Sequence, residues 1–155
     1  MKYLDWWNQA VRDLDTAEYL FKGKRCKEAS LFCQQAVEKG LKTVLLKNKK
    51  ELIKIHDLVE LGKLVNLGER FYNDCERLTG IYIDVRYPDM GSEEYSEDES
   101  ENDLEIAKEI LRTPTKSILV SPINLNILYL PHSYILIVLY ALRMSNICLV
   151  MTYAV

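Results

Sequence analysis

The segment ASLFCQQAVEKGLKTVL, residues 29–45, is the strongest indicator of the fold class of this chain. Its apolar side chains recur at helical spacing and form one face, while Gln34, Glu38 and Lys39 belong to the polar side. The apolar positions are Ala29, Phe32, Cys33, Ala36, Val37, Leu41, Val44 and Leu45. The pattern predicts an amphipathic helix over residues 26–47.

The residues before this segment continue the helical pattern. Apolar side chains at alternating steps of four and three predict an amphipathic helix over residues 3–22. Gly23 is expected to end it, with Lys22 and Lys24 near the negative end of the helix dipole. The apolar stripe comprises Tyr3, Trp7, Ala10, Leu14, Ala17 and Phe21. Because the connection to the next helix is short, the two helices are expected to be antiparallel neighbours.

Three more helices are predicted later in the chain. A third begins at the sequence His56-Asp57-Leu58, and a fourth begins at Phe71 and stops where Pro88 disfavours a helical conformation of the residue before it. A fifth covers the sequence LEIAKEILR. The expected ends are Gly68 for the third, Arg86 or Tyr87 for the fourth and Pro114 for the fifth, with Asn102 or Asp103 as the fifth N-cap. The predicted fold class is therefore all-α, an up-and-down bundle of four to five helices.

The composition is that of a soluble globular domain. Of 155 residues, 48% are hydrophobic and 28% charged, and the net charge of -3 gives no general attraction to nucleic acid or an anionic membrane. The four cysteines have no C-x-x-C spacing and only two histidines accompany them, so no metal site is predicted. The absence of a Gly-rich phosphate loop, H-E-x-x-H or a serine nucleophile elbow argues against an ATPase, a zinc hydrolase and an esterase. No cofactor is expected, and the lack of a secretory signal pattern predicts a cytoplasmic location.

Charge is unevenly distributed along the chain. Residues 113–155 have only two charged side chains, Lys116 and Arg143, whereas the run 89–103 has eight acids in fifteen residues and is expected to be a solvated loop. The predicted domains are a helical bundle over residues 3–112 and an apolar tail after it. Three interpretations of the tail stay open: a membrane span, which Arg143 disfavours; strands or an apolar surface covered by the bundle or a partner; and a change of reading frame at its start.

Four motifs in the predicted helices, taken in order, resemble the HEPN domain (higher eukaryotes and prokaryotes nucleotide-binding domain) over about residues 3–112. They are Trp7 with Ala10, Asp13-Leu14 and Ala17; AxxxxQQAVEKGLKTVL from Ala29; His56-Asp57-Leu58-x-x-Leu61; and Tyr82-x-x-x-Arg86-Tyr87-Pro88-Asp89. The resemblance implies a bundle of four or five helices that usually forms a homodimer and is frequently encoded beside a small nucleotidyltransferase.

Some members of this family are metal-independent RNA-cleaving toxins, in which an arginine is followed four to six residues later by a histidine. Arg86 occupies the matching place. The positions four to six residues after it are Met90, Gly91 and Ser92, so the catalytic assignment is not carried over and RNA is the less favoured ligand. The resemblance favours a non-catalytic module that binds a nucleotide, a nucleotidyltransferase partner or both, in a toxin–antitoxin type pair. The alternative is an RNA-cleaving toxin with an unconventional site, in which His56 substitutes as the base.

The candidate ligand-binding residues lie around Arg86. Tyr82 precedes it by one helical turn and Tyr87 follows it, so a phosphate on the guanidinium would have two phenols beside it. The alternative is structural: Arg86 pairs with Asp89 or with Glu38 and fixes the turn into the acidic run.

Three more candidates have two interpretations each. His56 is either a capping or buried polar residue, or the substitute base named above. Glu38 and Lys39 either line a groove or form a charge pair on a solvated helical face.

Overall fold

The computed structural model describes residues 3–49, 54–86 and 95–119. These residues form five α-helices and one 3₁₀ helix, and no strand occurs among them, which confirms the predicted all-α fold. The elements are α1 (Tyr3–Lys22), α2 (Cys26–Lys49), α3 (Leu58–Leu64), η1 (Glu69–Phe71), α4 (Tyr72–Arg86) and α5 (Glu97–Leu119). No helix within the described ranges is long and apolar enough to cross a membrane.

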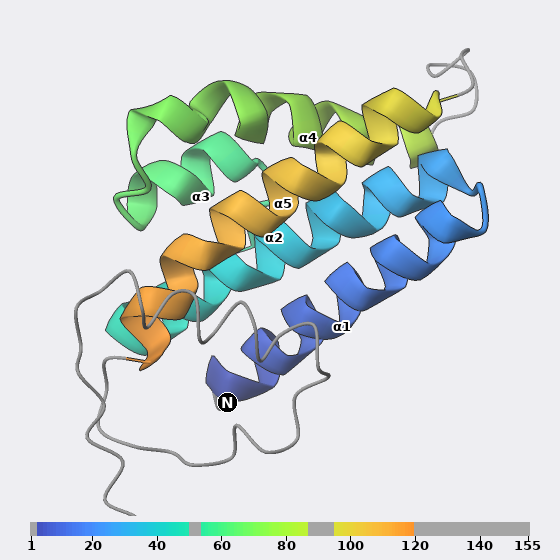
Figure 1. The fold of residues 1–155 in the computed structure, drawn as a ribbon. Coiled ribbons are helices and arrows are strands. Elements are labelled where there is room, and N and C mark those ends of the chain that lie inside the picture. The colour runs from blue at the N-terminus through green and yellow to red at the C-terminus, as the bar shows by residue number, and fades with distance from the viewer. Residues whose placement is uncertain (1–2, 50–53, 87–94, 120–155) are drawn as a thin grey trace, which may run out of the picture. The chain divides into compact units, whose positions relative to one another are not determined.

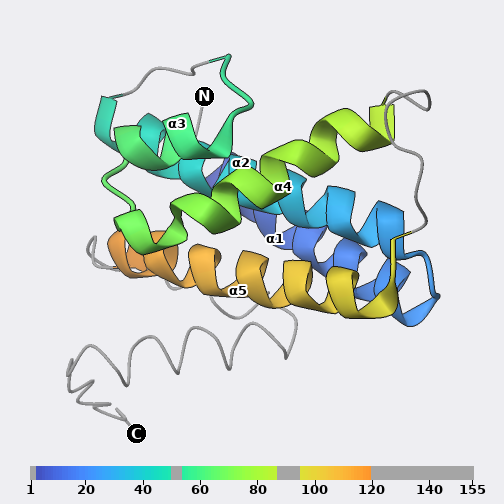
Figure 2. The ribbon, with the colours of Figure 1, turned by 90° about the horizontal axis from the view of Figure 1, so that it is seen from above.

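The helices pack around α2. Figures 1 and 2 show α1 and α2 side by side and antiparallel, with α4 and α5 lying over them. Helix α2 contacts α1, α3 and α4, and α3 lies against α4. By its contacts the chain divides into two compact units, Met1–Pro114 and Thr115–Val155, and the bundle belongs to the first. Of the predicted apolar tail, residues 113–119 belong to α5, and residues 120–155 lie outside the described residues.

The core consists of the apolar stripes that the sequence indicates. Fully buried side chains come from five helices and include Leu14, Leu41, Leu45, Leu58, Leu61, Leu78 and Ile110. The thiols of Cys33 and Cys75 are buried among them, and burial raises the pKa of both, that of Cys75 to about 12. These cysteines therefore pack as small apolar residues.

The turn between α1 and α2 has a different geometry from the one expected. Lys24, and not Gly23, is in the left-handed region, with φ of 60°. The amide of Arg25 donates to the carbonyl of Leu20 at 2.9 Å, and the amide of Lys24 donates to that of Phe21 at 2.9 Å. This pair of hydrogen bonds is a Schellman motif, in which Gly23 is the C-cap after the last helical residue, Lys22, and Lys24 reverses the chain.

Helix α3 ends in the same way, and earlier than expected. Asn66 has φ of 56°, and the amide of Leu67 donates to the carbonyl of Gly62 at 2.9 Å. Asparagine tolerates this conformation because its short side chain bonds locally. Gly68, expected to end α3, instead precedes η1 with an ordinary negative φ of -58°.

Helix α5 is the largest departure from the sequence prediction. It begins directly after Ser96, inside the acidic run expected to be a loop, because Ser96 and Glu99 form a capping box. The backbone amide of each residue donates to the side chain of the other, at 3.0 and 3.2 Å. Asp103 is therefore a buried residue within α5 and not its N-cap. Pro114 does not stop the helix either, since α5 extends to Leu119.

Helix α5 approaches α1 and α2 closely. The hydroxyl of Ser100 donates to the carbonyl of Cys26 at 3.0 Å, which ties the start of α5 to the start of α2. Near the other end, a Cβ placed on Gly40 would lie 2.3 Å from Leu111 Cδ2 and 3.9 Å from the ring of Trp7. A side chain at position 40 would thus force Leu111 to shift where the three helices meet.

Candidate functional site

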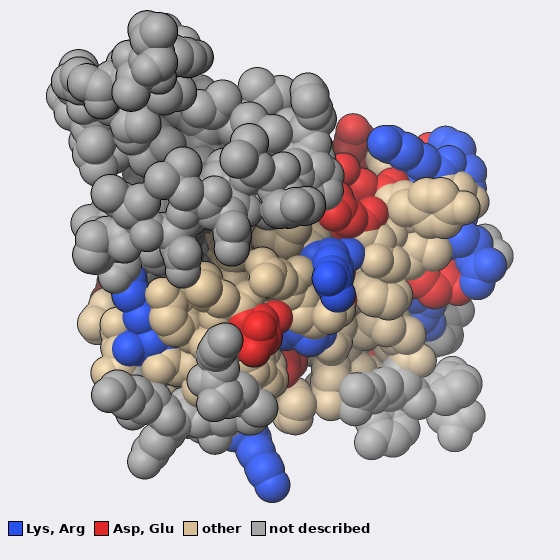
Figure 3. All heavy atoms as spheres, turned by 90° about the horizontal axis from the view of Figure 1, so that it is seen from below, with Lys and Arg blue, Asp and Glu red and all other residues tan. Residues whose placement is uncertain are grey.

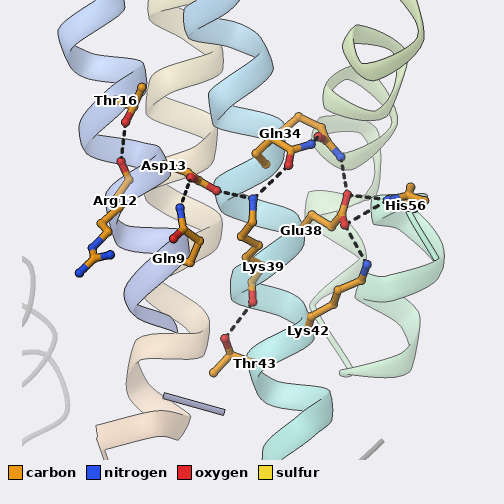
Figure 4. A network of polar contacts seen from close by, with 11 residues as sticks. Gln9, Arg12, Asp13, Thr16, Gln34, Glu38, Lys39, Lys42, Thr43 and His56 are labelled. Atoms are coloured by element: carbon orange, nitrogen blue, oxygen red, sulfur yellow. Dashed lines mark hydrogen bonds and ion pairs between the residues drawn. The ribbon is translucent and has the colours of Figure 1, made fainter. Parts of the chain in front are cut away.

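A buried carboxylate, Glu38 of α2, is the centre of the candidate site (Figure 4). Its carboxylate accepts hydrogen bonds at both oxygens, although the residue is only 6% exposed. Lys42 Nζ donates to Oε1 at 2.8 Å, and Gln34 Nε2 donates to Oε2 at 3.1 Å. Nδ1 of His56 lies 3.1 Å from Oε1 and 3.2 Å from Oε2. Helix α2 and the segment before α3 therefore meet at one carboxylate.

Glu38 is ionised in this environment. Burial by itself raises the pKa of a carboxyl group, but the hydrogen bonds from Lys42, Gln34 and His56 outweigh burial and hold the pKa of Glu38 below its usual value. The ion pair with Lys42 joins two side chains that are both nearly inaccessible to water. Such a pair is strongly coupled, because removal of either partner leaves a buried charge without compensation.

His56 lies between this carboxylate and α4. Its ring stacks on the ring of Tyr82 with centroids 5.3 Å apart and planes 13° apart. The side chain of His56 is 53% exposed, so one edge of the ring remains open to solvent. The N-cap of α3 is Asp57, which accepts a hydrogen bond from the amide of Glu60 at 2.9 Å. The expectation that His56 is a capping or buried residue is therefore wrong on both counts.

Arg86 is the last residue of α4 and follows Tyr82 by one helical turn. Its backbone thus lies next to the His56–Tyr82 pair, whereas its side chain is not among those described. Tyr87 and Asp89 lie outside the described residues, so the pairing of Arg86 with Asp89 stays a prediction. The pairing of Arg86 with Glu38 likewise stays a prediction.

Lys39 points the other way, toward α1. It forms an ion pair with Asp13 and donates to Gln35 Oε1 at 3.0 Å. Asp13 also accepts a hydrogen bond from Gln9 at 2.8 Å. Gln35 donates to Gln34 at 2.8 Å, which joins this group to Glu38 in one continuous network that runs from α1 across α2 to His56 (Figure 4).

The network corrects the interpretation of Glu38 and Lys39 as a charge pair on a solvated face. Each of the two pairs with a different partner, and the partners Lys42 and Asp13 are both buried. The sequence reasoning missed these two partners. The available signals were the i,i+4 spacing of Glu38 and Lys42, and an aspartate directly before the core residue Leu14.

Among the described residues on the face shown in Figure 3, acidic and basic side chains are interspersed among uncharged ones and form no extended basic surface. A hollow of about 440 Å³ lies between α3 and α4. Its lining includes Asp57 and Glu76 but, among the residues that the structure describes, no lysine or arginine. The lining of this hollow therefore supplies no cationic side chain for a phosphate.

Comparisons with known proteins give one consistent result. The sequence matches the family model described as HEPN domain over residues 3–118. The crystal structure of TT1696 from Thermus thermophilus is similar, with 27% identity, a TM-score of 0.66, and coverage of 74% of this chain and 97% of that chain. The crystal structure of ST0689, described as an archaeal HEPN homologue, is similar with 28% identity, a TM-score of 0.66, and coverage of 76% and 98%. No curated protein matches the sequence.

Proposed function

This chain belongs to the HEPN domain family, and we propose that it is a non-catalytic module that binds a nucleotide at the surface formed by His56, Tyr82 and Arg86. The observation that carries the proposal is the stacked His56–Tyr82 pair, held in place by the buried Glu38 and placed one helical turn before Arg86. An aromatic surface beside an arginine suits a ligand that has both a planar or sugar part and a phosphate.

The charges around the pair support Arg86 as the phosphate contact. Lys42 and Lys39 are paired with Glu38 and Asp13, so their charges are already compensated inside the bundle. Arginine also binds phosphate with two parallel N–H groups, which a lysine cannot do. The nucleotide phosphate would therefore depend on Arg86, with the exposed edge of His56 beside the sugar or base.

The proposal of protein partners for this chain rests on its family membership alone. Members of the family usually form homodimers and are frequently encoded beside a small nucleotidyltransferase, so a homodimer and such a partner, in a toxin–antitoxin type pair, are proposed for this chain. A small nucleotidyltransferase gene next to this one would support the extension, and purification of the two products as one complex would test it directly.

One observation favours a second function, metal-independent RNA cleavage. The imidazole of His56 has one nitrogen within hydrogen-bond distance of a buried carboxylate, while its other edge is exposed. A general base has this arrangement in many hydrolytic enzymes. In this alternative, His56 would remove the proton of a ribose 2′-hydroxyl and Arg86 would neutralise the phosphate. Loss of RNA cleavage in both His56→Ala and Arg86→Ala would support the alternative and contradict the non-catalytic proposal.

The main experiment is thermal unfolding of the full chain with and without ATP. ATP should raise the melting temperature of the wild type, because a ligand that binds the native state stabilises it by RT ln(1 + [L]/Kd). Arg86→Lys should weaken binding by about 1 to 3 kcal/mol, which is roughly 5- to 150-fold in Kd. Arg70→Lys is the matched control, since Arg70 is an exposed arginine of η1 paired with Glu109. The absence of any ATP-dependent shift in the wild type would remove the nucleotide site and leave partner binding as the function.

A further inference from the structure

The tautomer of His56 is determined by its surroundings. Glu38 is ionised and can only accept hydrogen bonds, and both of its oxygens lie within 3.2 Å of His56 Nδ1. Nδ1 must therefore carry the proton. In the neutral imidazole this leaves Nε2 with a lone pair, as an acceptor and not a donor.

The Nε2 atom is positioned for a ligand outside the bundle. The two carboxylate contacts and the stacking on Tyr82 fix the orientation of the ring. Among the described residues Nε2 has no hydrogen-bond partner, and the side chain of His56 is 53% exposed. The site thus presents one oriented acceptor next to the turn of α4 that contains Arg86.

We infer that His56 Nε2 accepts a hydrogen bond from a ribose hydroxyl, and that the site therefore selects ribonucleotides over deoxyribonucleotides. This inference rests on the proposed nucleotide site. Phosphate oxygens near neutral pH are acceptors and cannot bond to an acceptor, whereas the ribose hydroxyls are donors attached to the sugar that bears the phosphate. Arg86 follows Tyr82 by four residues, about 6 Å along the helix axis, so the sugar is the part of the ligand that reaches His56.

The test compares binding of ATP with that of 2′,3′-dideoxy-ATP to the full chain by calorimetry. The wild type should prefer ATP by about two- to tenfold at about pH 8, the range expected for one hydrogen bond between neutral groups. Equal binding of the two nucleotides at pH 8 would overturn the inference and leave the nucleotide site standing.

Two substitutions separate the role of Nε2 from that of the ring. His56→Phe keeps an aromatic ring against Tyr82 but removes both nitrogens, so it should bind the two nucleotides equally. Glu38→Gln supplies an amide donor to Nδ1, which moves the proton to Nε2 and should abolish the preference for ATP. Circular dichroism confirms that each variant is folded, and His56→Phe decides the result if Glu38→Gln unfolds. A wild-type preference in His56→Phe would refute the role of His56, and failure of both nucleotides to bind wild type would refute the site itself.

Discussion

The pairing of Arg77 with Asp103 gives the sharpest test of the fold, because the sequence predicts an entirely different role for Asp103. As an N-cap, Asp103 would be exposed and independent of α4. In the structure it is 0% exposed within α5, and Arg77 Nε donates to its Oδ1 at 2.6 Å. Its second oxygen is buried with no hydrogen-bond partner among the described residues. Arg77→Ala should therefore leave a buried carboxylate without compensation.

The expected cost follows from the burial of the two partners. Breaking a buried ion pair by removing one partner costs about 3 to 5 kcal/mol. Because the side chain of Arg77 is 38% exposed, water can approach Asp103 after truncation, and we expect the lower end, about 3 kcal/mol. For a domain of this size that corresponds to a decrease of roughly 10 °C in melting temperature. Arg77→Leu with Asp103→Leu should recover most of this loss, since an apolar pair needs no compensation.

Urea unfolding followed by circular dichroism measures these differences. Arg25→Ala is the matched control, because Arg25 forms an exposed ion pair with Glu28 and its removal should leave stability nearly unchanged. If the Arg77→Ala variant were as stable as the Arg25→Ala variant, the result would refute the buried ion pair between Arg77 of α4 and Asp103 of α5. A double substitution as unstable as Arg77→Ala alone would show that the buried charge is not the cause.

The remaining predictions concern helix packing, capping and acid stability. Gly80→Ala should stabilise the protein by about 0.5 to 1 kcal/mol in urea unfolding, since nothing lies within 4 Å of the added Cβ. Gly40→Ala should not stabilise it, because the new Cβ would overlap a core side chain 2.3 Å away. Leu14→Asp puts an unpaired charge at a fully buried position and should cost several kcal/mol, so an unchanged melting temperature would contradict the assigned core face. Ser96→Ala should cost about 1 kcal/mol by removing the cap of α5, which a helicity measurement at raised temperature would detect. Because the pKa of Glu38 is lower in the folded protein than its ordinary value of 4.5, the ionised side chain stabilises the fold above pH 4.5. This stabilisation is lost as the pH falls through the pKa of Glu38 in the folded protein. Stability measured between pH 7 and pH 3 should therefore depend less on pH in Glu38→Gln.

The sequence was sufficient to predict the helices whose formation depends on local periodicity. Helix α1 has the predicted bounds, and α2 extends the prediction from residue 47 to Lys49. The start of α5 was missed because eight acids in a short run resemble a solvated loop, although Ser96 and Glu99 have the spacing of a capping box. The left-handed conformations of Lys24 and Asn66 were not predicted, because the nearby glycines were expected to end the two helices instead.

Fold class and family could be inferred from the amino-acid sequence, because apolar periodicity and motif order are properties of residues close together in the chain. Which side chains meet depends on how the helices pack. Glu38 reaches His56 across 18 positions, and Arg77 reaches Asp103 across 26. Nothing in the residues between them encodes these contacts directly. They form because α2, α4 and α5 bury their apolar stripes in one core. This packing determines the position of each polar side chain and brings each buried charge next to the partner that compensates it.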